Sequence, residues 1–447
     1  MGTTGKKEIE INEPLIQVGI LLEQPTIHFS LSSAYQLEEK EMLPGDYSAA
    51  YSKGKILFNG ELLDELSFKP EDFHHDTFDL KDVIIGLHFH WERRENQRFQ
   101  GGLKIIVEKG GITTINIVSL EDYLRSVISS EMSATSSEEL LKAHAVISRS
   151  WLLAQIQKNK KIVDKYKTSF ESPTEIIRWY DREDHARFDV CADDHCQRYQ
   201  GITRQTTALV NKVIDETRGK VISYGDTICD ARFSKCCGGV METFENVWEP
   251  IAHPYLQGKA DFTGDAPLPD LTVEENADEW IRSSPPAFCN TGDADVLRQV
   301  LNDYDQETAD FYRWKVVYSQ EELSLLIRER SGIDYGEIID LQPLERGTSG
   351  RIIRLKIIGK ERVMTIGKEL EIRRTLSSSH LYSSAFVVDA EEENDEGIPQ
   401  KFTLTGAGWG HGVGLCQIGA AMMAEKGYNY EEILHHYFPD TKIDKKY

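Results

Sequence analysis

The chain has 447 residues, which suggests two or three domains at about 150 residues each. Its 40% hydrophobic and 28% charged residues are typical of a globular protein, and it contains no run of about 18 apolar residues that would span a membrane. The formal net charge of −23, from 51 basic and 74 acidic residues, disfavours nucleic acids and anionic membranes as partners.

The N-terminal part of the chain, residues 1–118, is expected to consist mainly of β-strands. The segments PLIQVGILL, KILFNG, IIGLHFHW and LKIIVEKGGITTINIV alternate or are rich in β-branched residues, with glycine turns between them. Within the last of these segments, EKGG fits a hairpin turn. The first 14 residues, MGTTGKKEIEINEP, contain no apolar stretch of the kind found in a signal peptide.

Two helices are expected next, separated by a short polar break. The first is predicted over residues 120–129. The second opens at Ser136, whose spacing to Glu139 fits a capping box that satisfies free N–H groups of the first turn. This helix continues through LLKAHAVISRSWLLAQIQ and is expected to be buried on one broad face. Glu131 and Met132 lie in the break, which places a carboxylate between the two helices.

The rest of the chain predicts a mixture of helices, strands and loops. A helix is expected over residues 203–217, a solvated acidic loop over 389–397, and a glycine-rich turn, GAGWGHGVG, before two C-terminal helices. We therefore predict an α+β protein in which an N-terminal mainly β region packs on an α+β core with long insertions. Its predicted parts are 1–118 (the β-rich region), 119–257 (the first part of the core), 258–345 (an insertion with its own helical pieces) and 346–447 (the second part of the core).

The cysteines favour a metal site with further buried thiols. There are seven, an odd and sparse number for this length, which argues against a disulfide scaffold. In HARFDVCADDHCQ, His185, Cys191 and Cys196 lie six and five positions apart, and zinc binds such sets of imidazole and thiolates. His195 is a weaker candidate, because a neighbour of Cys196 in an extended segment points away from it. The alternative is a loop with buried thiols and a solvated histidine.

Three separated segments resemble the SpoIID/LytB family. They are LEDYLRSVISSEM with the following EELLKAHAVISRSWLLA, then FSKCCGGVMETFENVW, and finally GWGHGVGLCQIGAAMMAEKGYNYEEILHHYFPDT. Together they cover about residues 120–256 and 404–442. The chain departs from the family pattern at His144, where glutamine is common, and at Cys236 and Cys237, where serines are common.

The resemblance implies a function on the bacterial cell wall. Active members of the family are peptidoglycan lytic transglycosylases, others were named as enhancers of amidases, and some carry a zinc site in the region of His185, Cys191 and Cys196. The glutamate of the family's Glu-Met pair is the catalytic acid, and here that residue is Glu131. The implied partners are peptidoglycan glycan strands, including strands stripped of peptide, and a cell-wall amidase. The implied location is the cell envelope or periplasm.

The chemistry of glycoside cleavage explains why a single glutamate is enough. The leaving oxygen needs a proton, and a carboxyl group supplies it near neutral pH when a partly apolar pocket raises its pKa. Most glycosidases use a second carboxylate. A lytic transglycosylase does not, because its carboxylate then deprotonates the muramyl C6 hydroxyl, which closes a 1,6-anhydro ring. We expect Glu131 to take both roles in cleaving MurNAc-GlcNAc bonds; the alternative is a surface glutamate near a helix end.

Seven further residues are candidates for substrate binding. In GWGHGVGLCQ the glycines allow a close backbone approach, the indole can stack on a sugar, and the imidazole and amide can bind its polar groups. A tight turn with a structural histidine explains the same residues. The arginine on the helix after Glu131 either orients a substrate carboxylate or forms a salt bridge with one of the many acids. The candidates are Arg149, Ser234, Gly238, Gly239, Trp409, His411 and Gln417.

Two other classes of function stay open. A Cys/His peptidoglycan peptidase would use Cys236 or Cys237 as nucleophile and His411 as base, although the sequence shows no third residue to orient the pair. A non-catalytic protein would bind the glycan or enhance an amidase without turnover, and the presence of Glu131 argues mildly against it.

Overall fold

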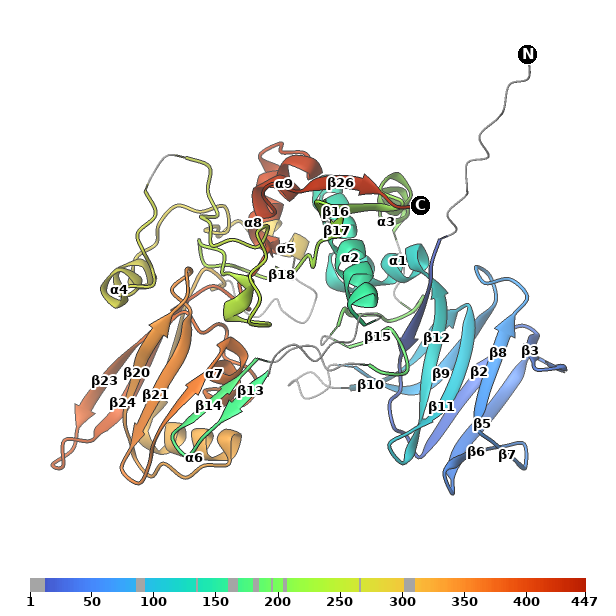
Figure 1. Cartoon of the computed structure of the whole chain (residues 1–447), viewed down its shortest axis with the longest axis horizontal. Coiled ribbons are helices and arrows are strands. Elements are labelled where there is room, and N and C mark those ends of the chain that lie inside the picture. The colour runs from blue at the N-terminus through green and yellow to red at the C-terminus, as the bar shows by residue number, and fades with distance from the viewer. Residues whose placement is uncertain are drawn as a thin grey trace, which may run out of the picture.

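The computed structural model describes residues 13–85, 93–133, 136–159, 168–179, 185–193, 196–203, 207–264, 267–300 and 310–447. Helices and several β-sheets are mixed along these ranges, which confirms the predicted α+β class. Figure 1 shows the N-terminal strands in blue and cyan, a second group of strands mainly in orange, and further helices between the two groups. Within the described ranges, no helix is both long and apolar enough to cross a membrane.

The N-terminal region is built from two β-sheets that share a hydrophobic core. Phe29 of one sheet meets Phe68 of the other with ring centroids 5.3 Å apart, and Phe58 lies 5.7 Å from Phe68. The first sheet has the order β15 (Val190–Cys191), β1 (Leu15–Gly19), β12 (Gly111–Ser119), β11 (Gly102–Glu108), β8 (Glu65–Pro70), β3 (Tyr35–Leu37) and β4 (Lys40–Met42). The second has the order β10 (Arg93–Gln100), β9 (Thr77–Ile85), β2 (Thr26–Leu31), β5 (Gly45–Ser52), β6 (Lys55–Phe58) and β7 (Glu61–Leu63).

The strand patterns of this region were predicted correctly where the structure describes them. PLIQVGILL contains β1, KILFNG contains β6, and LKIIVEKGGITTINIV forms the β11–β12 hairpin, in which Glu108 pairs with Gly111. The predicted strand IIGLHFHW begins inside β9, but its residues after Ile85 lie outside the described ranges. Alternation of side chains between the core and solvent accounts for these matches.

The two predicted helices form, but the second is more deeply buried than expected. Helix α1 spans Leu120–Glu131 and α2 spans Glu138–Asn159. The expectation of one broad buried face was wrong, because every side chain from 143 to 152 is buried. Ser136 does not act as predicted either: its hydroxyl donates to the carbonyl oxygens of Ser133 and Gln299, at 2.8 and 2.6 Å. Tertiary contacts therefore replace the predicted capping box.

The second strand-rich region has its own core and recruits strands from distant parts of the chain. Strands β14 and β22 pair in parallel, with Ile177 opposite Gly367, although 190 positions separate these residues in sequence. One sheet has the order β13 (Ser169–Glu171), β14 (Glu175–Arg178), β22 (Val363–Gly367), β21 (Ile352–Gly359) and β20 (Ile338–Arg346). The other has the order β19 (Arg313–Ser319), β24 (Pro399–Ala407) and β23 (Phe386–Glu393), and the helices α6 (Gln320–Ser331) and α7 (Glu369–Thr375) pack beside these sheets.

Two expectations for this half of the chain need comment. The acidic loop predicted over 389–397 was wrong in its first part, since residues 389–393 belong to β23 and expose their acids at the end of a strand. The predicted division at residue 345 stays a prediction, although β20 runs across it. Among the helical pieces expected in the insertion, SQEELSLLIRERSG forms α6 and ADVLRQV forms α5 (Ala294–Val300), while residues 301–309 lie outside the described ranges.

Short elements complete the molecule around α2. Strand β18 (Phe233–Ser234) pairs in parallel with β25 (Leu415–Cys416), which leads directly into α8 (Gln417–Glu425). The predicted helix over 203–217 forms as α3 (Ala208–Glu216). The remaining elements are β16 (Lys220–Tyr224), β17 (Thr227–Ile228), the 3₁₀ turn η1 (Phe244–Asn246), α4 (Glu274–Arg282), α9 (Tyr430–Tyr437) and β26 (Lys442–Lys445).

Candidate functional site

Glu131 is the last residue of α1 and is half-buried. The helix holds Leu124, Val127 and Ile128 in the core and stops at Met132, which has an extended backbone and is itself buried. The Oε1 atom of Glu131 accepts a hydrogen bond from the backbone N–H of Arg198, with a donor–acceptor distance of 3.0 Å. Since a backbone donor is rigid, this bond fixes one carboxylate oxygen while the side chain still reaches solvent.

Arg198 belongs to the loop that carries the three candidate zinc ligands. The Nε2 atom of His185 lies 3.5 Å from the Sγ atom of Cys196, which also accepts the N–H of Cys191 at 3.4 Å. One ligand atom from each of the three residues lies within 4.8 Å of the others. This donor set and spacing fit a zinc ion with three protein ligands and one open position. His195, the weaker candidate, lies outside the described residues.

The two later motifs of the sequence lie side by side. In addition to the β18–β25 pair, Cys236 and Trp409 exchange two backbone hydrogen bonds, at 3.0 and 2.8 Å. Gly238 and Gly408 cross here so closely that a Cβ on Gly238 would lie 2.9 Å from the nitrogen of Gly408. The segment FSKCCGG is therefore a structural partner of GWGHGVG.

Gln417 connects these two motifs to the first one. Its Nε2 atom lies 3.1 Å from the Nε2 atom of His144 on α2 and 3.8 Å from the Sδ atom of Met132, the neighbour of Glu131. His144 is fully buried, with its Nδ1 atom 3.2 Å from the hydroxyl of Ser148. Burial, and then the charge of Lys235, lowers the pKa of His144 to about 3, so the imidazole is neutral at neutral pH. The ring of Phe233, in FSKCCGG, also meets that of His144, with centroids 4.6 Å apart, so residues of all three motifs meet around His144.

His411 and Trp409 lie on the glycine-rich turn and are both partly exposed. The Nδ1 atom of His411 accepts the N–H of Val413 at 3.0 Å, and its ring meets Trp248 edge to face at 5.1 Å. Burial, followed by the positive charge of Arg232 and other guanidinium groups, lowers the pKa of His411 well below its usual range. His411 is therefore a neutral hydrogen-bonding group. The ring of Trp409 packs against that of Tyr382, with centroids 4.2 Å apart and planes tilted by 33°.

Arg149 is not placed to bind a substrate. Its side chain is fully buried and forms two hydrogen bonds with the carboxylate of Glu121, at 3.0 and 2.6 Å. A third bond runs to the carbonyl oxygen of Lys220 at 3.0 Å. The salt-bridge interpretation of Arg149 fits these contacts, because a ligand would have to open the interface between α1 and α2 to reach the guanidinium.

The residues around Cys236 face the interior as well. Ser234 is 6% exposed, and Gly238 and Gly239 are buried with positive φ angles of 82° and 105°. Burial raises the pKa of both Cys236 and Cys237 well above its usual range, and neither thiol is more than 2% exposed. Such thiols are poor nucleophiles, which argues against the Cys/His peptidase alternative.

Two residues near the motifs escaped the sequence analysis. Arg198 acts through its backbone N–H, a group that almost every residue has, so its residue type could not indicate this role. Arg351 is 1% exposed and donates to the carbonyl oxygens of Gly410, at 2.9 Å, and Cys237, at 3.1 Å. It therefore fixes the glycine-rich turn, and a Cβ on Gly412 would lie 2.5 Å from its Cζ atom. Arg351 lies in a segment with an ordinary strand pattern, which did not indicate that its side chain binds the glycine-rich turn.

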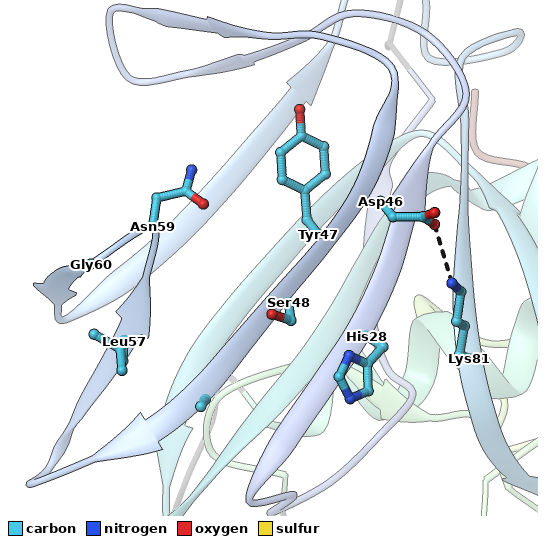
Figure 2. Close-up of a pocket in the computed structure, with 9 residues that line it drawn as sticks. His28, Asp46, Tyr47, Ser48, Leu57, Asn59, Gly60 and Lys81 are labelled. Atoms are coloured by element: carbon cyan, nitrogen blue, oxygen red, sulfur yellow. Dashed lines mark hydrogen bonds and ion pairs between the residues drawn. The ribbon is translucent and has the colours of Figure 1, made fainter.

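A hollow with a volume of about 560 Å³ lies elsewhere, on the N-terminal sheets. Figure 2 shows His28, Tyr47 and Asn59 around it, and Asp46 bound to Lys81 at 3.1 Å. None of its lining residues is a predicted site residue. The geometry around Glu131 is therefore independent of this hollow.

The comparisons with known proteins support the resemblance to the SpoIID/LytB family. The family model described as stage II sporulation protein (SpoIID) matches residues 108–224. Among relatives, stage II sporulation protein D of Bacillus subtilis is 22% identical over 74% of this chain and 76% of its own length. The amidase enhancer of Bacillus subtilis is 24% identical over 72% of this chain. These matches support the assignment of the chain to the SpoIID/LytB family.

Other matches qualify the extent of this relationship. The chain spans only 40% of the length of the amidase enhancer. An uncharacterised protein of Brachyspira hyodysenteriae is 26% identical over 77% of this chain and 72% of its own length. A second model, a domain of unknown function (DUF8618), matches residues 242–414. Glu131 and His185 lie within the SpoIID match, and His411 lies within the second match.

Proposed function

We propose that this SpoIID/LytB protein is a peptidoglycan lytic transglycosylase that cleaves the bond between MurNAc and GlcNAc and leaves a 1,6-anhydro product. The position of Glu131 carries the proposal. Glu131 is half-buried at a helix end and its carboxylate accepts the N–H of Arg198. Its neighbour Met132 contacts Gln417, which also contacts His144. Membership of the family supports the same assignment, with the cell envelope or periplasm as the site of action.

In the first step, Glu131 acts as general acid. Its Oε1 atom is held by Arg198, and we assign the proton to the other oxygen, which is then oriented by the fixed one. This proton passes to the GlcNAc oxygen as the bond from that oxygen to C1 of MurNAc breaks. Fixing the carboxyl group before substrate binds lowers the entropy cost of this transfer.

In the second step, the same group acts as general base. The Glu131 carboxylate takes the proton of the muramyl C6 hydroxyl while that oxygen forms a bond to C1. The proton that left in the first step is thereby replaced, and no water molecule is consumed. A second catalytic carboxylate, which hydrolytic glycosidases use, is not required.

The residues His185, Cys191 and Cys196 are proposed to hold zinc. Their ligand atoms lie close enough together for one ion, and a bound zinc would cross-link the loop and fix its backbone. Because Arg198 follows Cys196 by two residues, an ordered loop holds the N–H that orients Glu131. No step of the reaction needs to pass through the metal.

Trp409 and His411 are proposed to contact the glycan, because they are the candidates of the glycine-rich turn that reach the surface. A partly exposed indole can stack on a sugar face, and His411, which is also partly exposed, lies on the same turn. Gln417 is only 3% exposed, so its role is to support Met132 and His144 beneath Glu131.

A second candidate function is that of a non-catalytic amidase enhancer that binds glycan strands. The name of the Bacillus subtilis relative favours it, although this chain spans only 40% of that protein. Such a protein would need the glycan contacts but not the acid at position 131. Replacing Glu131 with glutamine would therefore abolish the first function and leave the second intact.

The test is the Glu131→Gln variant acting on peptide-free glycan strands. Glutamine keeps a carbonyl oxygen that can accept the N–H of Arg198, so the local fold is preserved while the acid is lost. We expect the release of 1,6-anhydro products, measured by mass spectrometry, to fall by about 10²- to 10⁴-fold. These products are lighter by one water than hydrolytic ones.

Glu138→Gln is the matched control. Glu138 begins the next helix and pairs with Lys142 and Lys212 near the surface, so its replacement should leave the rate within a factor of a few. Equal activity of Glu131→Gln and the unmodified chain would refute the catalytic assignment. No turnover in the unmodified chain, combined with strand binding and stimulation of an amidase, would establish the enhancer function instead.

A further inference from the structure

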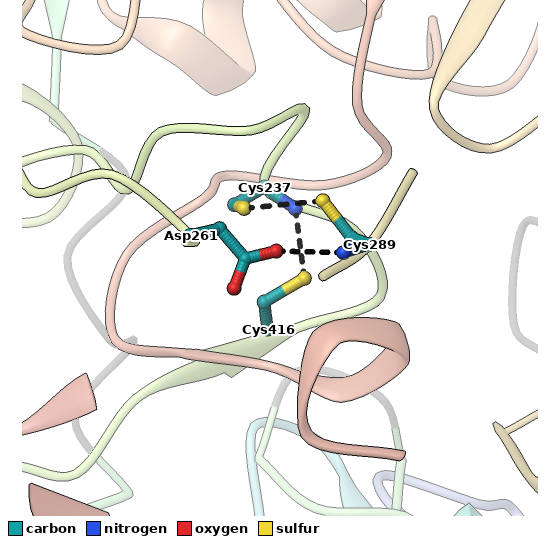
Figure 3. A group of neighbouring side chains, drawn as sticks. All are labelled: Cys237, Asp261, Cys289 and Cys416. Carbon is teal, nitrogen blue, oxygen red and sulfur yellow. Dashed lines mark hydrogen bonds between the residues drawn. The ribbon is translucent and has the colours of Figure 1, made fainter. Parts of the chain in front are cut away.

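Four side chains with metal-binding atoms meet inside the protein, away from His185, Cys191 and Cys196. They are Cys237, Asp261, Cys289 and Cys416, shown in Figure 3, and one ligand atom from each lies within 4.8 Å of all the others. They come from four separate segments: the loop after β18, the loops before and after α4, and the end of β25. Their exposed fractions are 2%, 0%, 1% and 0%, in the same order.

The spacing of the sulfur atoms matches a tetrahedral site. A Zn–S bond of about 2.3 Å places two sulfur ligands about 3.8 Å apart at the tetrahedral angle. The Sγ atoms of Cys237 and Cys289 lie 3.6 Å apart, which is close to this value and beyond the roughly 2.0 Å of a disulfide bond. The thiols are also free cysteines in the structure.

The surroundings of the cluster already orient its donors. The Sγ atom of Cys416 accepts the N–H of Cys237 at 3.2 Å. The carboxylate of Asp261 accepts the N–H of Cys289 at 2.9 Å and the hydroxyl of Tyr437 at 2.7 Å. Hydrogen bonds of this kind hold metal ligands in a single orientation, and they leave further lone pairs on sulfur and oxygen for an ion.

A cation would also stabilise the buried charge of Asp261. A fully buried carboxylate is costly unless it is paired or binds a metal. The basic side chain nearest to it in the described part of the chain is His436, whose Nε2 atom lies 3.8 Å from its Oδ1 atom. Beyond the cluster, Arg351 and Arg313 donate to the carbonyl oxygens of Cys237 and Gly238, at 3.1 and 3.0 Å, which offsets the negative charge of thiolate ligands.

We propose that Cys237, Asp261, Cys289 and Cys416 bind one zinc ion in a closed, structural site. Binding releases the three thiol protons and fills all four positions, so no open position is left for a substrate. The ion joins the loops of residues 258–300 to the FSKCCGG segment and to the start of α8. This site holds the insertion on the core, and it stands whether or not Glu131 is catalytic.

Two other buried cysteines provide the specificity of the test. Cys236 precedes Cys237 and its thiol borders those of Cys289 and Cys416, but it lies outside the four-residue set. Cys229 is 0% exposed and belongs to neither metal-binding cluster, so Cys229→Ser removes a buried thiol without touching a proposed ligand. It is the matched control for Cys289→Ser.

The first experiment counts zinc by elemental analysis in the full chain, expressed with zinc and purified without chelator. Cys289→Ser should lose one equivalent relative to the unmodified chain, while Cys229→Ser should lose none. The double variant Cys191→Ser/Cys196→Ser should keep the equivalent that Cys289→Ser loses. Equal zinc in the unmodified chain and a folded Cys289→Ser variant would overturn the proposal.

The second experiment needs no variant. An anomalous difference map, collected at the zinc edge from crystals of the unmodified chain, should show a peak among the four side chains. An empty position would overturn the proposal, and so would a Cys237–Cys289 disulfide, which mass spectrometry without reductant detects as the loss of two hydrogens. A peak ligated by Cys236 in place of Asp261 would overturn the assignment of the fourth ligand.

Discussion

The buried ion pair between Arg149 and Glu121 should control the stability of the helices that carry the site. Replacing Arg149 with methionine removes the two bonds to Glu121, at 3.0 and 2.6 Å, and the bond to the carbonyl oxygen of Lys220. Glu121 would keep the N–H of Gly219, at 3.1 Å, and the hydroxyl of Tyr447, at 2.5 Å, but no guanidinium. Removing one partner of a buried pair costs about 3–5 kcal/mol.

Hydrogen–deuterium exchange is the suitable assay, because a chain of this size need not unfold in two states. A loss of about 3–5 kcal/mol in local stability accelerates exchange in α1 and α2 by roughly 10²- to 10⁴-fold when exchange proceeds through opening. Arg125→Met is the control, since Arg125 also extends from α1 but pairs with the exposed Asp215. Its exchange should change by less than about 10-fold, in line with about 1 kcal/mol for a surface pair.

The opposite pattern would refute this reasoning. If Arg149→Met left exchange in α1 and α2 unchanged and weakened binding to glycan strands, Arg149 would contact substrate after all. The double variant Arg149→Met/Glu121→Gln adds a second check. Because it leaves no uncompensated charge, it should exchange more slowly than Arg149→Met alone.

Three further predictions address the other elements of the site. Burial lowers the pKa of His144 from 6.5 to about 3, so between these pH values the unfolded chain binds more protons than the folded chain, and stability falls as the pH drops below about 6.5. His144→Gln should therefore reduce the loss of stability between pH 7 and pH 5 by about 2 kcal/mol. The measurement is the change in Tm between these two pH values, which should be smaller in the variant. Gly412→Ala places a Cβ 2.5 Å from Arg351 at a φ of 76°. It should lower both Tm and activity more than the control Gly397→Ala, where φ is 73° but the space around the glycine is open. Equal effects of the two variants would show that the contact with Arg351 is unimportant. Cys191→Ser/Cys196→Ser should lose one equivalent of zinc and reduce turnover, while binding to glycan strands persists. Normal turnover without that zinc would show that the loop does not position Glu131.

Much of the local structure was accessible from the sequence because short-range patterns specify it. The β11–β12 hairpin follows from alternation and a glycine turn, and α6 follows from its own helical pattern. The helix predicted over residues 120–129 ended two residues before Glu131, which is the last residue of α1, so the sequence placed this carboxylate near a helix end without any knowledge of the fold. By contrast, the acidic run at 389–397 predicted a loop, and pairing with β24 made a strand of its first part.

The sequence by itself determined which residue types were present and where the chain turns. The spacing of its histidine and cysteines indicated the loop of His185, Cys191 and Cys196, and its resemblance to the SpoIID/LytB family indicated Glu131 as the candidate acid. Only the tertiary structure decided how each group is used. Arg149 had many acids as possible partners, and the packing of α2 on α1 selected Glu121. The N–H of Arg198 and the meeting of Cys237, Cys289 and Cys416 left no local pattern, because residues that are distant in sequence are brought together by the core rather than by spacing along the chain.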